Sequence, residues 1–158
     1  MAIEVTVSKT KPMTVAFLSM KGPYTLIGEA FGKLYGWIGE KGLIPAGPPS
    51  GVYFNSLDQV PAEELVWELR CPIIGDVALS GPDEQGLGAK TVEEVEVAYT
   101  LHKGPFNQVG PVYGALVAWI TGNGYEIAGP SEEVYLSDPG STPPGELLTE
   151  VRFSVKKK

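Results

Sequence analysis

An internal repeat constrains this chain more than any other feature of its sequence. Shifted by 82 positions, residues 13–73 match residues 95–155 without a gap, with 21 identities in 61 positions. Two copies of this length are too few for a solenoid, so they should pack on one another as a pair. The repeat therefore predicts two modules related by pseudo-twofold symmetry, with a cleft between them. The identical pairs are Val15/Val97, Ala16/Ala98, Lys21/Lys103, Gly22/Gly104, Pro23/Pro105, Gly28/Gly110, Gly32/Gly114, Leu34/Leu116, Trp37/Trp119, Ile38/Ile120, Gly42/Gly124, Ala46/Ala128, Gly47/Gly129, Pro48/Pro130, Val52/Val134, Tyr53/Tyr135, Pro61/Pro143, Glu64/Glu146, Leu65/Leu147, Glu68/Glu150 and Arg70/Arg152.

Each copy opens with a predicted strand and a predicted helix. Residues 13–20 and 93–103 are rich in Val, Tyr, Phe and Thr, which is typical of a strand, and each run ends at a Gly-Pro turn. Apolar residues at helical spacing follow each turn, which predicts one amphipathic helix per copy. They are Ile27, Ala30, Phe31, Leu34 and Ile38 in the first copy, and Val109, Val112, Tyr113, Leu116 and Ile120 in the second.

Glycines lie at the predicted ends of both helices and at intervals within the first helix. Gly42 and Gly124 stand where a helix ends on a left-handed residue. Gly28, Gly32 and Gly36 lie four residues apart, and we expect them to let the first helix approach a sheet closely.

Two further strands complete each module. Residues 51–55 and 133–137 are short β-prone segments, and residues 65–73 and 147–155 are longer ones. With an extra strand near residues 3–7, the order predicts an α+β fold, a tandem duplication of a β-α-β-β module. We predict a single domain over residues 1–158, with module 1 at about 1–73, a connector at 74–92 and module 2 at about 93–158. The connector is rich in glycine, so we expect it to be exposed.

Composition excludes several classes of function. The 158 residues carry a net charge of −7, which repels phosphate backbones, so we expect no direct nucleic-acid binding. The chain has one cysteine, no leader pattern and no apolar run of membrane-spanning length, so we expect a cytoplasmic protein without membrane contact. His102 is the only histidine, so we expect no metal site and no cofactor, and we place His102 at the surface or rim of the fold.

The amino-acid sequence of the second copy resembles that of the GyrI-like effector-binding family. The resemblance lies in Lys103-Gly104-Pro105-Phe106, Trp119-Ile120, Glu133-Val134-Tyr135-Leu136-Ser137-Asp138-Pro139 and Thr142-Pro143-Pro144. The first copy adds Gly47-Pro48-Pro49, Gly51-Val52-Tyr53 and Val60-Pro61-Ala62-Glu63-Glu64-Leu65, so the resemblance covers nearly the whole chain.

The resemblance implies three competing functions. Members of the family form a ligand cleft from two β-α-β-β modules and bind bulky, often cationic or aromatic compounds. The first hypothesis is therefore a small-molecule binding protein. The second is a hydrolase of reactive cyclopropane-type toxins, and the third is a protein-interaction module similar to gyrase-inhibiting proteins. Whether the chain is an enzyme stays open, although we favour binding.

Positions that differ between the copies are the best candidates for function. Glu133 corresponds to Gly51, so one copy has an acid where the other has only backbone. The resemblance also implies that this glutamate lies at the base of the ligand cleft. In a binding protein, a buried carboxylate would balance the positive charge of a ligand cation. In a hydrolase, it would act as the general base. Glu133 is our first candidate, and a solvent-facing glutamate on an edge strand is the alternative.

Aromatic residues are expected to form the walls of such a site. Tyr135 shares a strand face with Glu133, and Tyr53 is its repeat partner. Trp67 replaces Thr149 of the other copy and offers a face for a cation, or else fills a gap in the packing. The remaining candidates for ligand contact are Tyr35, Tyr113, Trp37 and Trp119, although the two helical tryptophans more often act as core anchors. If the protein is a hydrolase, Glu133 and Tyr135 are the candidate catalytic residues.

Overall fold

The computed structural model describes residues 3–75, 78–138 and 140–158. It has a mixed α+β fold in which two helices accompany antiparallel strands, as the sequence predicts. Contacts divide the chain into two compact units. We call Pro12–Glu93 the first unit, and Met1–Lys11 together with Glu94–Lys158 the second unit.

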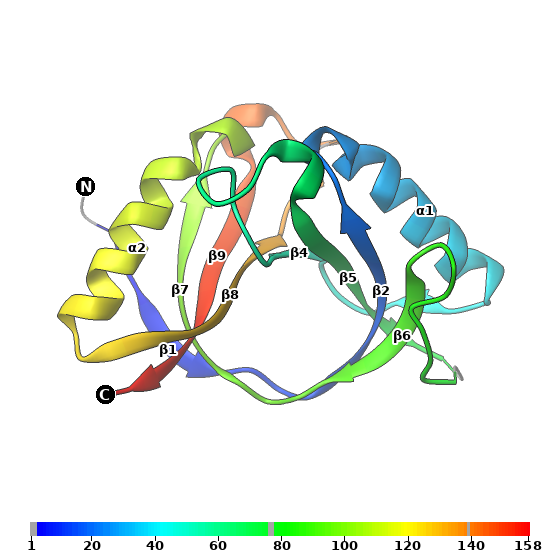
Figure 1. Ribbon diagram of the computed structural model, residues 1–158, viewed down its shortest axis with the longest axis horizontal. Coiled ribbons are helices and arrows are strands. Elements are labelled where there is room, and N and C mark those ends of the chain that lie inside the picture. Colours follow the sequence, from blue (N-terminus) through cyan, green and yellow to red (C-terminus); the bar gives the residue numbers. More distant parts are fainter. Residues whose placement is uncertain (1–2, 76–77, 139) are drawn as a thin grey trace. The chain divides into compact units, whose positions relative to one another are not determined.

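Among its described residues, the second unit has four antiparallel strands and one α-helix. Its elements are β1 (Thr6–Lys9), β7 (Glu96–Lys103), α2 (Gly110–Gly122), β8 (Tyr125–Tyr135) and β9 (Leu148–Lys157). The strand order is β1-β7-β9-β8. Helix α2 runs alongside these strands (Figure 1).

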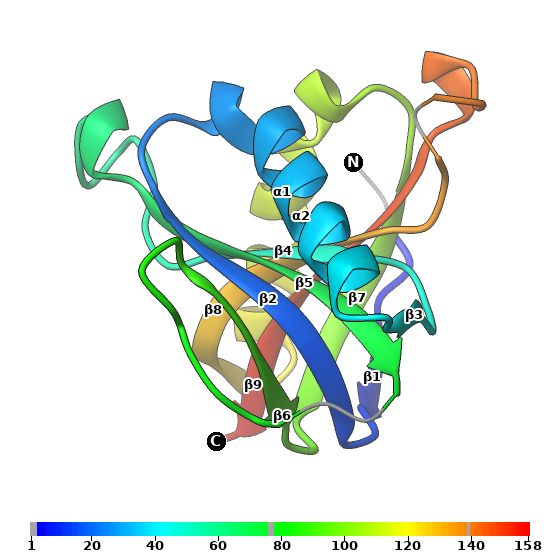
Figure 2. The ribbon, with the colours of Figure 1, turned by 90° about the vertical axis from the view of Figure 1, so that its right-hand side faces the viewer.

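The first unit has the same plan. Its four main strands are ordered β4-β5-β2-β6, and short β3 also pairs with β5. Helix α1 lies across these strands (Figure 2). The elements are β2 (Met13–Lys21), α1 (Ile27–Glu40), β3 (Ile44–Pro45), β4 (Ser50–Tyr53), β5 (Val66–Ile74) and β6 (Leu87–Val92).

Short 3-10 helices stand at matching places in the two units. In each unit, one follows the first Gly-Pro turn and another precedes the last strand of the repeat. The two units therefore place their short helices beside the same kinds of turn and strand. The short helices are η1 (Tyr24–Leu26), η2 (Ala62–Glu64), η3 (Phe106–Gln108) and η4 (Pro144–Glu146).

Each helix buries its apolar stripe against its own sheet. Leu34 and Ile38 of α1 are buried with Trp67 of β5 in the core of the first unit. Leu116 and Ile120 of α2 are buried with Ala98, Val151 and Val155 in the core of the second unit. Burial of such stripes supplies most of the stability of helices this short.

Two predicted boundaries differ from the structure. The predicted connector at 74–92 contains β6, which pairs with β2 and buries Leu87 and Ala89. The extra strand, predicted at 3–7 in module 1, is β1 at Thr6–Lys9, and it pairs with β7 of the second unit. Both strands are short, and long-range pairing rather than local propensity decides where such a strand belongs.

The prediction for the helix glycines was wrong. Gly28, Gly32 and Gly36 are exposed, and a Cβ atom at any of them would meet no atom within 4 Å among the described residues. They lie away from the buried stripe, so they permit no close packing on the sheet. The helix-ending glycines are confirmed, because φ is +70° at Gly42 and +83° at Gly124.

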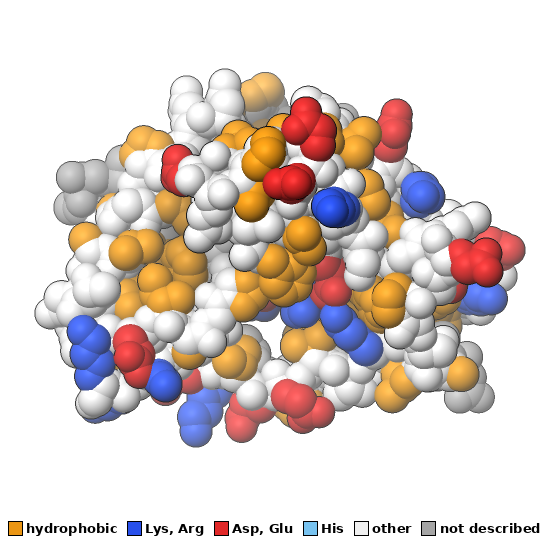
Figure 3. All heavy atoms as spheres, in the orientation of Figure 1, with side chains coloured by type: hydrophobic (Ala, Val, Ile, Leu, Met, Phe, Trp, Pro, Cys, Tyr) orange, Lys and Arg blue, Asp and Glu red, His pale blue; other side chains and the backbone are white. Residues whose placement is uncertain are grey.

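The surface carries charges of both signs. On the face drawn in Figure 3, acidic and basic side chains are interspersed rather than gathered in one basic patch. Within residues 3–75, 78–138 and 140–158, no helix is long and apolar enough to cross a membrane.

Candidate functional site

Glu133 stands on the face of β8 that α2 covers. It is paired directly with Val151 of β9, and opposed residues of an antiparallel pair point to the same face. Val151 belongs to the core beneath α2, so the Glu133 side chain enters the helix-covered side of the sheet. The alternation of β8 thus places a carboxylate in largely apolar surroundings.

Two tyrosine hydroxyls hold the carboxylate. The Tyr113 hydroxyl, from α2, donates to Oε2, and the Tyr135 hydroxyl, two residues along β8, donates to Oε1 at 3.3 Å. Burial raises the pKa of Glu133, because it penalises the charged form. The bonds from Tyr113 and Tyr135 and the charge of His102 act in the opposite direction and only partly offset burial.

Aromatic rings surround this acid. Phe106 meets Tyr135 edge to face with ring centroids 5.6 Å apart, and Phe153 meets Tyr113 in the same way at 6.1 Å. Such pairs fix the rings that carry the two hydroxyls. Sequence reasoning named both tyrosines but missed both phenylalanines. The alternation of β9 would have found Phe153, because it shares a strand face with Val151.

His102 and Thr149 continue the polar groups along the same sheet face. His102 of β7 and Tyr135 of β8 both pair with Thr149 of β9, from opposite sides. His102 is only 8% exposed, so its predicted surface or rim position was wrong, and its Nε2 lies 3.0 Å from the Pro105 carbonyl oxygen. Thr149 is fully buried, and its Oγ1 has no hydrogen-bond partner among the described residues.

The equivalent place in the first unit is closed by aromatic rings. A Cβ atom at Gly51 would lie 2.5 Å from the Tyr53 hydroxyl, so the Tyr53 side chain folds back over the glycine. Tyr135 folds back over Glu133 in the same sense, but there its hydroxyl meets a carboxylate. Trp67, predicted as a ligand contact, has no exposed surface, and its indole N–H donates to the Gly22 carbonyl at 2.9 Å.

The other predicted contacts lie on the helices. The Tyr35 hydroxyl is 3.9 Å from the Cys71 sulfur, and Trp37 lies beneath the Lys41 ammonium at 5.8 Å. In the second unit, Trp119 stacks on Tyr125 at 6.2 Å. Of the predicted aromatics in that unit, the structure brings Tyr113 and Tyr135 to Glu133, while Trp119 packs near the far end of α2.

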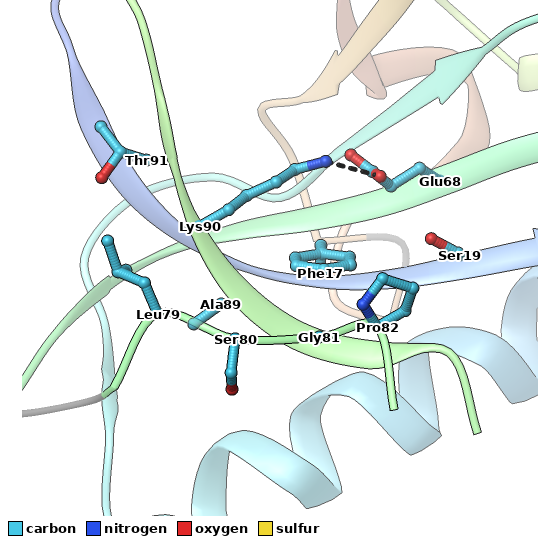
Figure 4. A pocket seen from close by; sticks show the side chains of 10 residues that line it. All are labelled: Phe17, Ser19, Glu68, Leu79, Ser80, Gly81, Pro82, Ala89, Lys90 and Thr91. Carbon is cyan, nitrogen blue, oxygen red and sulfur yellow. Dashed lines mark hydrogen bonds and ion pairs between the residues drawn. The ribbon is translucent and has the colours of Figure 1, made fainter. Parts of the chain in front are cut away.

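A separate hollow of about 460 Å³ lies on the first unit (Figure 4). Within it, the Lys90 ammonium is 2.8 Å from the Glu68 carboxylate and 4.4 Å above the Phe17 ring. Arg70 binds the second oxygen of Glu68. These charges already satisfy one another, so the hollow offers less to a charged ligand than Glu133 does. Among the described residues, no three Asp, Glu, His or Cys side chains are grouped to hold a metal ion.

Solved structures show the same fold. The crystal structure of the EcmrR C-terminal domain aligns with a TM-score of 0.80 at 19% identity, over 100% of each chain. The chain spans 58% of EcmrR in its complex with DNA. A hydrolase from Listeria innocua aligns with a TM-score of 0.72 at 16% identity, over 97% of this chain and 92% of the other. SAV2435 bound to tetraphenylphosphonium aligns with a TM-score of 0.61 at 14% identity, over 98% and 94%.

The sequence itself carries the family assignment. Among curated proteins, none matches this chain significantly. The profile of the GyrI-like small molecule binding domain matches residues 3–156, which is nearly the whole chain. This match confirms the resemblance found in the sequence. The chain therefore belongs to the GyrI-like small molecule binding domain family.

Proposed function

We propose that the protein binds lipophilic organic cations, with Glu133 as their counter-charge. The observation that carries this proposal is a carboxylate on the helix-covered sheet face, held by two tyrosine hydroxyls and edged by Phe106 and Phe153. Aromatic faces attract cations, and an acid in apolar surroundings gains most from an opposite charge. The net charge of −7 adds a weak general attraction for cations.

The family supports the ligand class. The chain belongs to a family of small-molecule-binding domains, and one protein of the same fold, SAV2435, is known with tetraphenylphosphonium bound. That cation is permanently charged and carries four aromatic rings. It is therefore a suitable first probe for a site made of one carboxylate and several aromatic side chains.

The test compares two variants that remove the same charge from β8. Glu133→Gln removes the proposed counter-charge. Glu126→Gln removes a half-exposed carboxylate of the same strand, β8, which pairs with Lys156 of the neighbouring strand β9. Loss of one partner of a desolvated charge pair costs about 2–5 kcal/mol, so Glu133→Gln should weaken tetraphenylphosphonium binding by about 30-fold or more. Glu126→Gln should bind like wild type in isothermal titration calorimetry. Equal affinities of all three proteins would exclude this role for Glu133.

Hydrolysis is the second candidate, favoured by one feature of the same residue. Burial raises the pKa of Glu133 toward the working pH, and general bases act best there. The Tyr135 hydroxyl would donate a hydrogen bond to the leaving oxygen or carbonyl oxygen of the substrate, where negative charge develops. Turnover of a strained, alkylating substrate that disappears in Glu133→Gln would establish hydrolysis. Cation binding without any turnover would exclude hydrolysis and leave binding as the function.

A further inference from the structure

The buried hydroxyl of Thr149 lacks a hydrogen-bond partner in the part of the chain that the structure describes. Its Oγ1 is inaccessible and has no hydrogen-bond partner among the described residues. Leaving such a group unpaired destabilises the fold, so it marks a place where a further polar group belongs. The first unit avoids this cost, because Trp67 stands at the equivalent position and its N–H is paired.

The position of Thr149 links this hydroxyl to the Glu133 site. Thr149 pairs with Tyr135, and Val151 pairs with Glu133, so Thr149 and Glu133 are diagonal neighbours on one sheet face. Diagonal neighbours lie about 7–8 Å apart, within reach of a long side chain such as that of Glu133, so an ammonium group between the two can meet both. His102 closes the other side of Thr149, and its Nε2 is engaged by the Pro105 carbonyl.

We infer that Thr149 is a specificity-determining residue of this site, whose hydroxyl accepts a hydrogen bond from a protonated amine held by Glu133. The inference rests on the proposed cation-binding function. A primary or secondary ammonium has at least two N–H groups, so one donates to Glu133 Oε1 and the other to Thr149 Oγ1. A quaternary cation has none, and it gains only the charge attraction and the aromatic contacts.

Access to Thr149 requires a side chain to move. The Tyr135 hydroxyl reaches Glu133 at 3.3 Å, which is long beside the usual O–H···O distance of about 2.7–2.8 Å. A ligand N–H that takes Glu133 Oε1 replaces this weak bond, and the Tyr135 ring turns aside only by also leaving its edge-to-face contact with Phe106. Tyr113 keeps its own bond to Oε2 throughout.

The experiment uses two cations with the same aromatic body. The N-methylammonium and the N,N,N-trimethylammonium derivatives of diphenylmethane are titrated into wild type, Thr149→Val and Thr149→Ser by calorimetry. Thr149→Val removes the hydroxyl at nearly constant shape, and Thr149→Ser keeps it. A hydrogen bond from a charged donor predicts that Thr149→Val weakens the N-methylammonium by about tenfold and leaves the quaternary cation unchanged. Thr149→Ser should retain the preference of wild type.

Each result decides between the two proposals. If Thr149→Val changes both affinities equally, or neither, the hydroxyl does not select the ligand and the inference is overturned while cation binding stands. If neither cation nor tetraphenylphosphonium binds wild type, cation binding itself is overturned, and the inference with it. Thermal unfolding of the ligand-free variants provides the fold control, and Thr149→Val should melt no lower than wild type because it removes an unpaired buried group.

Discussion

Tyr113→Phe tests how the tyrosine hydroxyls control the charge of Glu133. The substitution keeps the ring and its contact with Phe153, and it removes the donor to Glu133 Oε2. This bond stabilises the charged form and holds down a pKa that burial raises. Its loss must therefore raise the pKa of Glu133 further.

The consequence for binding depends on pH. A cation binds the ionised carboxylate, so below the folded pKa it must first displace a proton. A hydrogen bond to a charged group is worth about 1.5–3 kcal/mol, so Tyr113→Phe should weaken binding by about 10- to 100-fold at a pH where wild-type Glu133 is ionised and that of the variant is protonated. At a pH above both pKa values, the two affinities should converge.

The dependence of binding on pH is measured as the affinity for tetraphenylphosphonium from pH 5 to pH 9, because this probe itself does not titrate. Tyr135→Phe is the matched comparison, since its bond to Glu133 is long at 3.3 Å. Its profile should shift in the same direction by less. A profile unmoved by Tyr113→Phe, or a larger shift in Tyr135→Phe, would refute the reasoning.

Three further predictions concern stability. Trp67→Ala empties a fully buried position and should lower the free energy of unfolding by about 3–5 kcal/mol in a urea titration, whereas Trp37→Ala, at a half-buried helix position, should cost less. Gly51→Ala places a Cβ atom 2.5 Å from the Tyr53 hydroxyl and should cost about 1–3 kcal/mol. The cost should shrink when Tyr53→Phe removes that oxygen, and strictly additive effects in the double-mutant cycle would contradict the contact. Because the folded pKa of Glu133 is raised, its stabilising contribution is present below the unfolded value of 4.5 and is lost as pH rises through the folded value. Glu133→Gln should therefore gain thermal stability over wild type between acidic and neutral pH, and a constant difference across that range would show that Glu133 titrates normally.

The sequence alone determined the α+β fold class and the family, and it proposed Glu133 as the first candidate site residue. The Gly-Pro turns and helical spacing are local signals, and they placed both helices and most of the strands correctly. The difference between Glu133 and Gly51 identified the acid, because equivalent positions that diverge in chemistry are visible without coordinates. The family resemblance pointed to the same residue.

Only the tertiary structure decided what surrounds that acid. Strand register and the η3 turn bring four side chains to this acid, and no local pattern specifies that meeting: those of His102, Phe106, Thr149 and Phe153. The same long-range pairing assigned β1 to the second unit and formed β6 from an expected connector. Local propensity selects helices and strands, but burial and pairing select which side chains meet, so the sequence supplied the acid and the fold supplied its environment.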